Sequence, residues 1–525
     1  MIHSIEIKDF RALKNVNINL GKYITAISGR NGLGKSTILA LLGNTCELKV
    51  KEGKTLFDTQ FRTEFSEIFK ASKEFDKSGS DKFKVNFNDI SNPDKISDCK
   101  ISRVTWQKGK RFRVIPETKN EKEKNSRKKE LPSIYLGLSR LYPIGEVSDE
   151  EINIKNIKLE EEEEIYFVDN YIDILNLKMD EGENLSFEMI DIGRTRRKKG
   201  IGVCTSTYSS ITNSAGQDNI GQIIMSILSF RKLSKNNKNY NGGLLLIDEI
   251  DAALHPIAQI KLVRFLYKAC KELKLQVVFT THSVSLLKYL CSKVLHNKNT
   301  NVNNYEIHYL TTNNGPLKVL RNTEFPIIEN DLMLSQPGSN IKKITVYSED
   351  SEGRWFFQKL TEKYSLYLDV IKVKLSYESL LQLNKNDPLY FSNVLFVLDG
   401  DVKSIEESGN SKGNIIKLPG EVRPEQVIYE FLLNLSSDSQ LWENGLNIGF
   451  SKESIEENGP LSQKFDGKDR ERYKKWFNEN LGIIESLDVF GYWIKENEEM
   501  YNNFIERFKS SYNTIAKRKL SPIIK

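Results

Sequence analysis

Short runs of apolar residues alternate with amphipathic stretches through the first half of the chain. Met1 to Phe10 alternates apolar and polar positions, as a half-buried strand does. The apolar run Tyr23 to Ile27 predicts a buried strand, and Thr37 to Leu42 predicts an apolar helix after it. Two strand-then-helix units follow at Leu244 to Lys271 and at Val277 to Leu290. Together these elements predict an α/β fold.

A second series of short apolar runs predicts a further, smaller α/β domain. Its predicted strands are Ile341 to Tyr347, Val370 to Leu375, Val394 to Leu398 and Ile415 to Leu418. The predicted organisation is an α/β domain over residues 1–325 with a charged insertion at about 147–200, a linker over 326–340, the smaller α/β domain over 341–435 and a helical extension over 436–525.

The composition excludes several classes of protein. Of the 525 residues, 39% are hydrophobic and 28% are charged, which is a globular profile and not that of a disordered or collagen-like chain. No apolar run approaches the roughly 18 residues of a membrane span, and the start lacks the features of a secretory signal. Five cysteines are scattered without CxxC pairs, which argues against a zinc site or a disulfide framework. We expect a cytoplasmic protein with reduced thiols.

The net charge of +6 permits an anionic partner but does not establish one. Charge is concentrated between Glu146 and Arg197, where five consecutive glutamates, Glu160 to Glu164, precede a basic cluster at Arg194 to Lys199. A solvated insertion is the simpler interpretation of such runs. The basic cluster is also a candidate surface for a nucleic-acid backbone.

The most specific local motif is Gly29-Arg-Asn-Gly-Leu-Gly-Lys-Ser36, which lies between the first apolar strand and its helix. It matches G-x-x-x-x-G-K-[ST], a phosphate-binding loop. Glycines let backbone N–H groups surround phosphate oxygens, Lys35 bridges the β- and γ-phosphates, and Ser36 supplies its hydroxyl to Mg²⁺. The flanking elements favour this interpretation over a chance glycine-rich turn. ATP is the expected ligand, and the candidate contacts are Arg30, Asn31, Gly32, Gly34, Lys35, Ser36 and Thr37.

Two carboxylates, Asp248 and Glu249, end the apolar strand that begins at Gly243. This is the edge of an α/β sheet where ligands bind. Asp248 is the candidate to hold Mg²⁺, and Glu249 is the candidate to polarise the water that attacks the γ-phosphate. Two solvated acids at a strand end are the alternative. His282 ends the next strand and is a candidate contact for the γ-phosphate or the water, although a lone histidine is more often only hydrogen-bonded structure.

These motifs, with Asp9 to Arg11, Ser214 to Gln217, Leu244 to Pro256 and Thr281-His282, resemble the ABC-type ATPase heads of the SMC, RecF and OLD families over roughly residues 1–320. The resemblance implies that Ser214, Gly216 and Gln217 complete the site on a second subunit's nucleotide. It therefore implies a homodimer or higher oligomer around two ATPs. Ala215 departs from the usual signature, and Ile134 to Arg140 stands where a Q-loop glutamine is expected.

Further carboxylates follow the predicted strands of the smaller domain. Glu349 ends the first of these strands, Asp399 and Asp401 end another, and Glu421 and Glu425 follow the next. Two acids at i and i+2 with a glutamate from a neighbouring strand end can collect one or two Mg²⁺ ions, which orient a phosphodiester for hydrolysis. A hydrophilic strand-to-loop bend is the alternative interpretation of Asp399-Gly-Asp401.

The order of these acids is similar to that of a Toprim domain, and an ABC head followed by Toprim resembles the OLD family of ATP-dependent nucleases. The expected fold is thus an ABC-type P-loop ATPase domain, a smaller Toprim-like α/β domain and a helical C-terminal segment. Asp350 stands where Toprim domains usually have glycine, and Gly353 comes later. The family also uses a later lysine, for which Lys464, Lys468 and Lys474 are candidates.

The helical extension contains Trp442, Trp476 and Trp493 among charged residues. Arg470, Arg472, Lys474 and Lys475 around Tyr473 and Trp476 are a second candidate surface for nucleic acid. Aromatic residues packed in a core beside a solvated helix face are the default alternative.

The function expected from these features is an ATP-hydrolysing dimer whose Toprim-like domain cuts DNA with Mg²⁺, or with Mn²⁺ at that site. The OLD family includes Gabija-type and retron-linked phage-defence proteins, so the resemblance implies antiviral defence. Two alternatives remain open. One is a regulatory ATPase whose degenerate Toprim-like domain docks a separate nuclease, as in Septu-like systems, and the other is a repair ATPase that only clamps DNA. None of the three involves a membrane.

Overall fold

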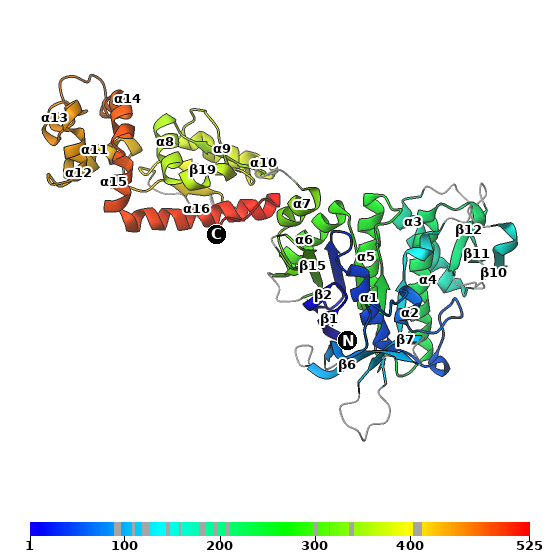
Figure 1. Ribbon diagram of the computed structural model, residues 1–525. Coiled ribbons are helices and arrows are strands. Elements are labelled where there is room, and N and C mark those ends of the chain that lie inside the picture. The colour runs from blue at the N-terminus through cyan, green and yellow to red at the C-terminus, as the bar shows by residue number, and fades with distance from the viewer. Residues whose placement is uncertain are drawn as a thin grey trace. The chain divides into compact units, whose positions relative to one another are not determined.

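The computed structural model describes residues 1–88, 96–107, 111–117, 127–142, 148–156, 159–177, 185–192, 198–204, 209–298, 303–313, 315–334, 341–402 and 412–525. The chain divides into two compact units, Met1–Leu334 and Ser335–Lys525, and each is described by itself (Figure 1). Most of the basic cluster predicted at Arg194 to Lys199 lies outside the described residues. Among the described helices, none combines the length and the apolar character needed to cross a bilayer.

A six-stranded sheet forms the centre of the first unit, in the order β16-β15-β3-β14-β13-β9. All neighbouring strands are parallel except β15 and β16. Every residue of β3, β13 and β14 is buried, as expected for parallel strands covered on both faces. The bounds are β3 Ile24–Gly29, β9 Ser133–Leu136, β13 Gly243–Ile247, β14 Leu275–Thr280, β15 Tyr305–Thr311 and β16 Lys318–Arg321.

Helix α1 (Lys35–Asn44) lies between this sheet and a five-stranded antiparallel sheet of order β2-β1-β5-β6-β7. Its apolar residues share one core with Leu246 of the parallel sheet and with Ile5 and Phe83 of the antiparallel sheet. Helices α5 (Pro256–Leu273) and α6 (Val284–Lys298) pack on β14 and β15. The antiparallel strands are β1 Ile2–Phe10, β2 Leu13–Asn19, β5 Gly79–Asn88, β6 Ile96–Gln107 and β7 Arg111–Pro116.

The described parts of the predicted charged insertion form strands and a helix. Strands β10 (Ile152–Asn156), β11 (Ser186–Ile192) and β12 (Lys198–Cys204) form a three-stranded antiparallel sheet beside α3 (Glu161–Leu175) and α4 (Ala215–Asn236). The five glutamates cap α3 and occupy its first turn, where the helix dipole favours negative charge. The opposite face of α3 buries an apolar stripe of Phe167, Tyr171 and Ile174.

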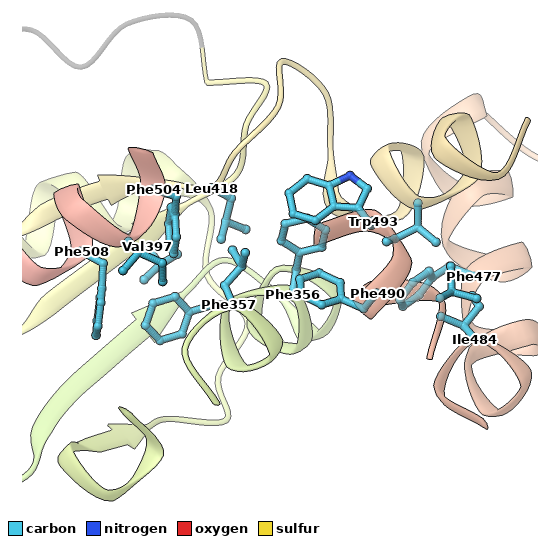
Figure 2. Close-up of a cluster of buried hydrophobic side chains, with 14 of the residues drawn as sticks. Phe356, Phe357, Val397, Leu418, Phe477, Ile484, Phe490, Trp493, Phe504 and Phe508 are labelled. Atoms are coloured by element: carbon cyan, nitrogen blue, oxygen red, sulfur yellow. The ribbon is translucent and has the colours of Figure 1, made fainter. Parts of the chain in front are cut away.

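A four-stranded parallel sheet of order β18-β17-β19-β20 forms the centre of the second unit. Helices α8 (Ser351–Leu360) and α16 (Glu498–Lys519) share a core with one face of the sheet, and α9 (Tyr377–Asn386) shares a core with the other. Figure 2 shows the first of these cores, where Phe356, Phe357, Phe490 and Phe508 from helices meet Val397 from the sheet. The strands are β17 Ile344–Ser348, β18 Leu368–Val370, β19 Leu395–Leu398 and β20 Ile415–Lys417.

The C-terminal part of this unit is helical, as predicted, and its tryptophans are core residues. Trp442, Trp476 and Trp493 are all buried. Its helices are α11 Pro424–Asn434, α12 Gln440–Gly445, α13 Lys452–Glu457, α14 Asp469–Ser486, α15 Val489–Glu496 and α16. The remaining described elements are β4 Cys46–Glu47, α2 Phe65–Ile68, β8 Lys129–Glu130, α10 Pro388–Phe391 and short 3₁₀ turns that include η2 Leu138–Leu141.

The predicted linker at 326–340 begins with structure. Helix α7 (Phe325–Met333) occupies its first part and belongs to the first unit, with Phe325 and Ile328 buried. A proline in the first turn, at position 326, suits a helix start because its missing N–H has no helical partner there. Residues 335–340 lie outside the described residues.

Candidate functional site

The phosphate-binding loop predicted at Gly29 to Ser36 joins β3 to α1. Gly34 has φ 87° at the N-cap of α1, and a Cβ there would lie 2.8 Å from Leu13. Gly29 has φ 143°, and a Cβ there would lie 2.4 Å from the carbonyl oxygen of Leu310. Both positions therefore require glycine, and the loop leads directly into a helix N-terminus that favours an anion.

The side chain of Lys35 folds back over this loop. Its Nζ donates hydrogen bonds to the carbonyl oxygens of Gly29 at 2.9 Å and of Arg30 at 2.8 Å. Burial lowers the pKa of Lys35, and the negative charges of Glu249, Asp248 and Asp251 oppose that shift. An ammonium group is thus held against the loop and in the field of the acids at the adjacent strand end.

Ser36 and Asp248 are brought together from positions far apart in the sequence. The Ser36 Oγ donates to Asp248 Oδ1 at 3.0 Å, and Thr280 Oγ1 donates to the same oxygen at 2.6 Å. The hydroxyl of Tyr135 donates to Asp248 Oδ2 at 3.4 Å. A hydroxyl and a carboxylate in contact beside a phosphate loop are the oxygen ligands that Mg²⁺ prefers, so these residues fit the predicted ion.

Glu249 and His282 stand at the same sheet edge. Glu249 has a left-handed backbone, with φ 47°, and its N–H donates to Thr280 Oγ1 at 2.7 Å. The His282 N–H donates to Asp251 Oδ1 at 3.3 Å, whereas its buried ring Nε2 has no partner among the described residues. Burial, and then the charge of Lys35, lower the pKa of His282. A neutral imidazole with an unpaired nitrogen can bind a phosphate-bound or water proton.

The predicted signature residues begin helix α4. Ser214 is exposed and forms a capping box with Gln217: each side chain accepts a hydrogen bond from the other residue's backbone N–H, at 3.3 and 2.8 Å. Gly216 packs against the turn after β13, where a Cβ would lie 2.5 Å from the carbonyl oxygen of Ala253.

The other predicted nucleotide contacts are divided between the loop tip and its flanks. Asn31 and Gly32 are exposed at the tip, and Thr37 is buried in the first turn of α1. Arg30 is half-buried and bonds to Asp331 of α7, at 2.5 Å to Oδ1 and 2.9 Å to the carbonyl oxygen. Its guanidinium is therefore already paired within the first unit.

Two predicted acids of the second unit lie in contact at the ends of adjacent strands. Glu349 follows β17 and Asp399 follows the adjacent β19, and the Asp399 N–H donates to Glu349 Oε1 at 2.9 Å. Asp401 lies two residues on and pairs with Arg423 at 3.0 Å. Glu425 is almost fully buried in the first turn of α11, whereas the alternative candidate Glu421 is exposed.

Two of these acids have buried oxygens without hydrogen-bond partners in the described residues, namely Asp399 Oδ1 and both carboxylate oxygens of Glu425. Burial raises the pKa of Asp399 to about 8, and the neighbouring charges of Glu349 and Asp350 add to the shift. Burial likewise raises the pKa of Glu425 to about 7. Buried carboxylates that repel one another and lack donors need a cation or a proton to be stable.

These orphaned oxygens fit a divalent ion. Within the described residues, no three His, Cys, Asp or Glu side chains are already close enough together to enclose one. Like charges separate when no cation is between them, so side-chain rotations would be needed to close the site. Glu349, Asp399, Asp401 and Glu425 are the residues that would hold the ion.

Lys474 of α14 is the candidate lysine that reaches this cluster. Its Nζ donates to Asp350 Oδ2 and, at 3.3 Å, to Glu352 Oε2. Asn478 from the next turn donates to Glu352 Oε1 at 2.8 Å. Burial favours a higher pKa for Asp350, but the bonds from Lys474 and from the Gly353 N–H outweigh it and lower that pKa.

The other lysine candidates are placed differently, since Lys464 pairs with Glu479 and Lys468 is the N-cap of α14. Sequence reasoning overlooked Glu352 and Asn478, which carried no recognisable signal. It also left Gly353 unexplained: a Cβ at this position would lie 2.6 Å from Asp399 Oδ1. The absence of a side chain at this position therefore makes room for the Asp399 carboxylate.

The basic and aromatic surface predicted around Tyr473 and Trp476 is not a stacking platform. Trp476 is 1% exposed, and both rings pack edge-on against Tyr429. Arg472 is half-buried and bonds to the carbonyl oxygen of Ser462. Trp476 is therefore a core residue, and Tyr473 is partly buried against the same core.

One known protein family matches part of the first unit. The family described as “AAA domain, putative AbiEii toxin, Type IV TA system” matches residues 95–288. This range contains Ser214, Asp248, Glu249 and His282 but not the phosphate loop. The match and the contacts of Lys35 together support an ATPase-type P-loop domain in the first unit. None of the curated proteins matches the chain.

Several solved structures are similar to the chain. The SMC head domain from Thermotoga maritima shares 13% identity and a TM-score of 0.31, over 61% of this chain and 98% of that one. An SMC head bound to the C-terminal winged-helix domain of ScpA shares 16% identity and a TM-score of 0.35, over 61% and 97%. The recombination mediator RecF shares 12% identity and a TM-score of 0.29, over 61% and 98%.

Proposed function

We propose that the chain is a dimeric ATPase whose second unit cuts DNA with a divalent metal ion. The observation that supports the ATPase half is the bond between Ser36 Oγ and Asp248 Oδ1, which joins the phosphate loop to the adjacent strand end. The observation that supports the nuclease half is the orphaned Asp399 Oδ1 beside Glu349. In each unit, carboxylates that need a cation lie where the proposed chemistry requires a phosphate group to bind.

In the first unit, the loop N–H groups and Lys35 would bind the β- and γ-phosphates of ATP. Ser36 and Asp248 would hold Mg²⁺, which neutralises phosphate charge when bound. Glu249 would orient and deprotonate the attacking water, and His282 Nε2 would bond to that water or to the γ-phosphate. These roles agree with the hydrogen bonds of each group. The Asp248 carboxylate accepts hydrogen bonds from three hydroxyls, whereas His282 Nε2 has no hydrogen-bond partner among the described residues.

The exposed start of α4 supports completion of the site by a second subunit. Ser214 is exposed at the N-terminus of α4, and a helix N-terminus favours an anion. We therefore place them on the γ-phosphate of a partner subunit's ATP, as the resemblance to SMC, RecF and OLD heads implies. Two subunits would then enclose two nucleotides.

In the second unit, Glu349, Asp399, Asp401 and Glu425 would hold Mg²⁺ or Mn²⁺. A bound ion orients a phosphodiester and stabilises charge on its oxygens. Lys474 stands beside the cluster and would neutralise charge on the scissile phosphate. We accordingly propose a Toprim-like nuclease of the OLD type. A role in antiviral defence is proposed by analogy with that family alone, and a plaque assay with the Asp399→Asn variant would test it.

The Lys35→Ala variant tests the ATPase half directly. We expect loss of tight ATP binding, about 10²-fold or more in Kd, because no other cation contacts the loop carbonyls of Gly29 and Arg30 in the described residues. Titration with a fluorescent ATP analogue in Mg²⁺ measures it. Lys261→Ala, which removes a surface lysine bonded to Asp173, is the matched control and should bind normally. Tight binding by Lys35→Ala would overturn the proposed ATPase site.

The Ser214→Arg variant tests the shared site. We expect normal nucleotide affinity in each subunit but a kcat lowered about 10²-fold, because the long cationic side chain blocks the approach of a second nucleotide to α4. Steady-state ATPase assays and sedimentation with ATP measure the two effects. Asn236→Arg, at the exposed far end of the same helix, is the control. Unchanged hydrolysis by Ser214→Arg would argue against completion by a partner.

A further inference from the structure

Arg140 is a buried cation whose contacts all lie within the ATPase unit. It stands on η2, directly after β9, and its side chain is 2% exposed. Nη1 donates to the carbonyl oxygens of Leu136 at 3.2 Å and Gly137 at 2.9 Å, which fixes the guanidinium to its own turn. Burial lowers its pKa to about 10, against the opposing charge of Asp248. It remains a cation at neutral pH.

The remaining donors of Arg140 reach two other elements. Nη2 donates to the carbonyl oxygen of Glu249 at 2.9 Å. Nε donates to Asn219 Oδ1 of helix α4 at 2.8 Å. One planar side chain thus connects the turn after β9, the turn after β13 and the helix that begins at Ser214. Gln222 of α4 completes the connection by donating to the Arg140 carbonyl oxygen at 3.1 Å.

The bond to Glu249 acts on an unusual backbone. Glu249 has φ 47°, in the left-handed region that non-glycine residues rarely adopt. Its N–H is held by Thr280 Oγ1 at 2.7 Å, and its carbonyl oxygen is held by Arg140. Such a conformation persists only where the surroundings enforce it. The direction of the Glu249 side chain therefore depends on both contacts.

Helix α4 is tied to the same turn by two further contacts. Asn219 Nδ2 donates to the carbonyl oxygen of Ala252 at 3.1 Å. Gly216 lies so close to Ala253 that a Cβ would meet its carbonyl oxygen at 2.5 Å. Movement of the N-terminal part of α4 therefore cannot occur without displacing the turn that follows Glu249, because the two are packed backbone to backbone.

We infer that Arg140 is a positioning residue that transmits occupancy of the Ser214 face by a partner's nucleotide to Glu249 of the same subunit. The inference rests on the proposed ATPase dimer. A nucleotide bound at Ser214 fixes α4, Asn219 orients the guanidinium, and Nη2 holds the Glu249 carbonyl so that its carboxylate faces the water. Lysine cannot make these contacts at once, since it lacks the planar fork.

The Arg140→Lys variant measures this role in the full chain. We expect kcat for ATP hydrolysis to fall about 10²-fold, the loss typical of a misplaced catalytic group. Affinity for a fluorescent ATP analogue should stay within about threefold, because Lys35, Ser36 and Asp248 are untouched. Arg321→Lys, at a guanidinium that pairs with Glu306 on the edge of the sheet, is the matched control and should leave both values unchanged.

Double-mutant cycles separate positioning from general support of the fold. If Arg140 acts through Glu249, Arg140→Lys adds nothing to the residual rate of Glu249→Gln, and it likewise adds nothing to Ser214→Arg. A merely structural residue would lower both rates further and would weaken nucleotide affinity in parallel, which overturns the inference. Normal kcat in Arg140→Lys also overturns it. Failure of the ATPase proposal is recognised separately, by unchanged ATP binding in Lys35→Ala.

Discussion

The Asp399→Asn variant is expected to lose metal-dependent DNA cleavage by about 10³-fold or more, the loss that follows removal of a metal-holding carboxylate. Asp399 Oδ1 is a buried oxygen without a donor in the described part of the chain, and the backbone N–H of Asp399 is bonded to Glu349. Asparagine keeps the size of the side chain and removes its charge, so the fold should be retained while the ion is lost. Plasmid incubated with purified protein and Mg²⁺ or Mn²⁺ measures the rate, and thermal unfolding checks the fold.

Asp369→Asn, at an exposed position of β18 in the same sheet, is the matched control and should cut normally. Cleavage retained by Asp399→Asn would exclude this cluster as the nuclease site. Absence of cleavage by the unaltered protein, restored when a second protein is added, would instead favour the regulatory alternative in which the unit docks a separate nuclease. DNA binding without cleavage under any condition would favour the clamp.

Local motifs made it predictable that the phosphate-binding loop lies beside Asp248. The spacing of Gly29 to Ser36 specifies a loop in which a backbone must curve tightly, and the apolar run before Asp248 specifies a buried strand that ends at the ligand edge. Both the loop motif and the apolar run are short, and each depends on residue types at fixed positions. The contact of Ser36 with Asp248, 212 residues apart, then follows from parallel strand order.

The residues that were missed depend on long-range packing. Asn478 reaches Glu352 across 126 residues, from a helix whose charge pattern looks like any solvated face. The contacts of Arg140 form only when the fold brings β9, α4 and the turn after Glu249 together. No periodicity in the local sequence predicts such long-range contacts, because water could equally satisfy the hydrogen-bonding groups of each side chain.

The acidic run predicted exposed side chains but not the helix that carries them. The run Glu160 to Glu164 predicted a solvated insertion, and all of its glutamates except Glu163 are exposed, but the run also begins a helix whose other face is buried. Acidic residues favour a helix N-terminus as much as they favour solvent, so composition alone does not separate the two. The stripe of Phe167, Tyr171 and Ile174 at helical spacing was the better signal.

The Glu249→Gln variant is expected to bind ATP and to hydrolyse it about 10²- to 10⁴-fold more slowly, the contribution of a general base. The side chain keeps its size, and the backbone contacts of Glu249 with Thr280 and Arg140 are unaffected by the change. Bound ATP should therefore persist between two subunits and trap the dimer. Single-turnover hydrolysis measures the first effect, and sedimentation with ATP and Mg²⁺ measures the second.

Trapping must depend on both halves of the shared site if Glu249 acts as proposed. Adding Lys35→Ala or Ser214→Arg to Glu249→Gln should return the chain to its nucleotide-free association state, because the first removes the ATP and the second blocks its partner surface. Glu272→Gln, at an exposed position near the end of α5, is the control and should hydrolyse ATP normally. Rapid turnover by Glu249→Gln would contradict its role as the base. It would leave His282, with its unpaired Nε2 at the same edge, as the group to test next.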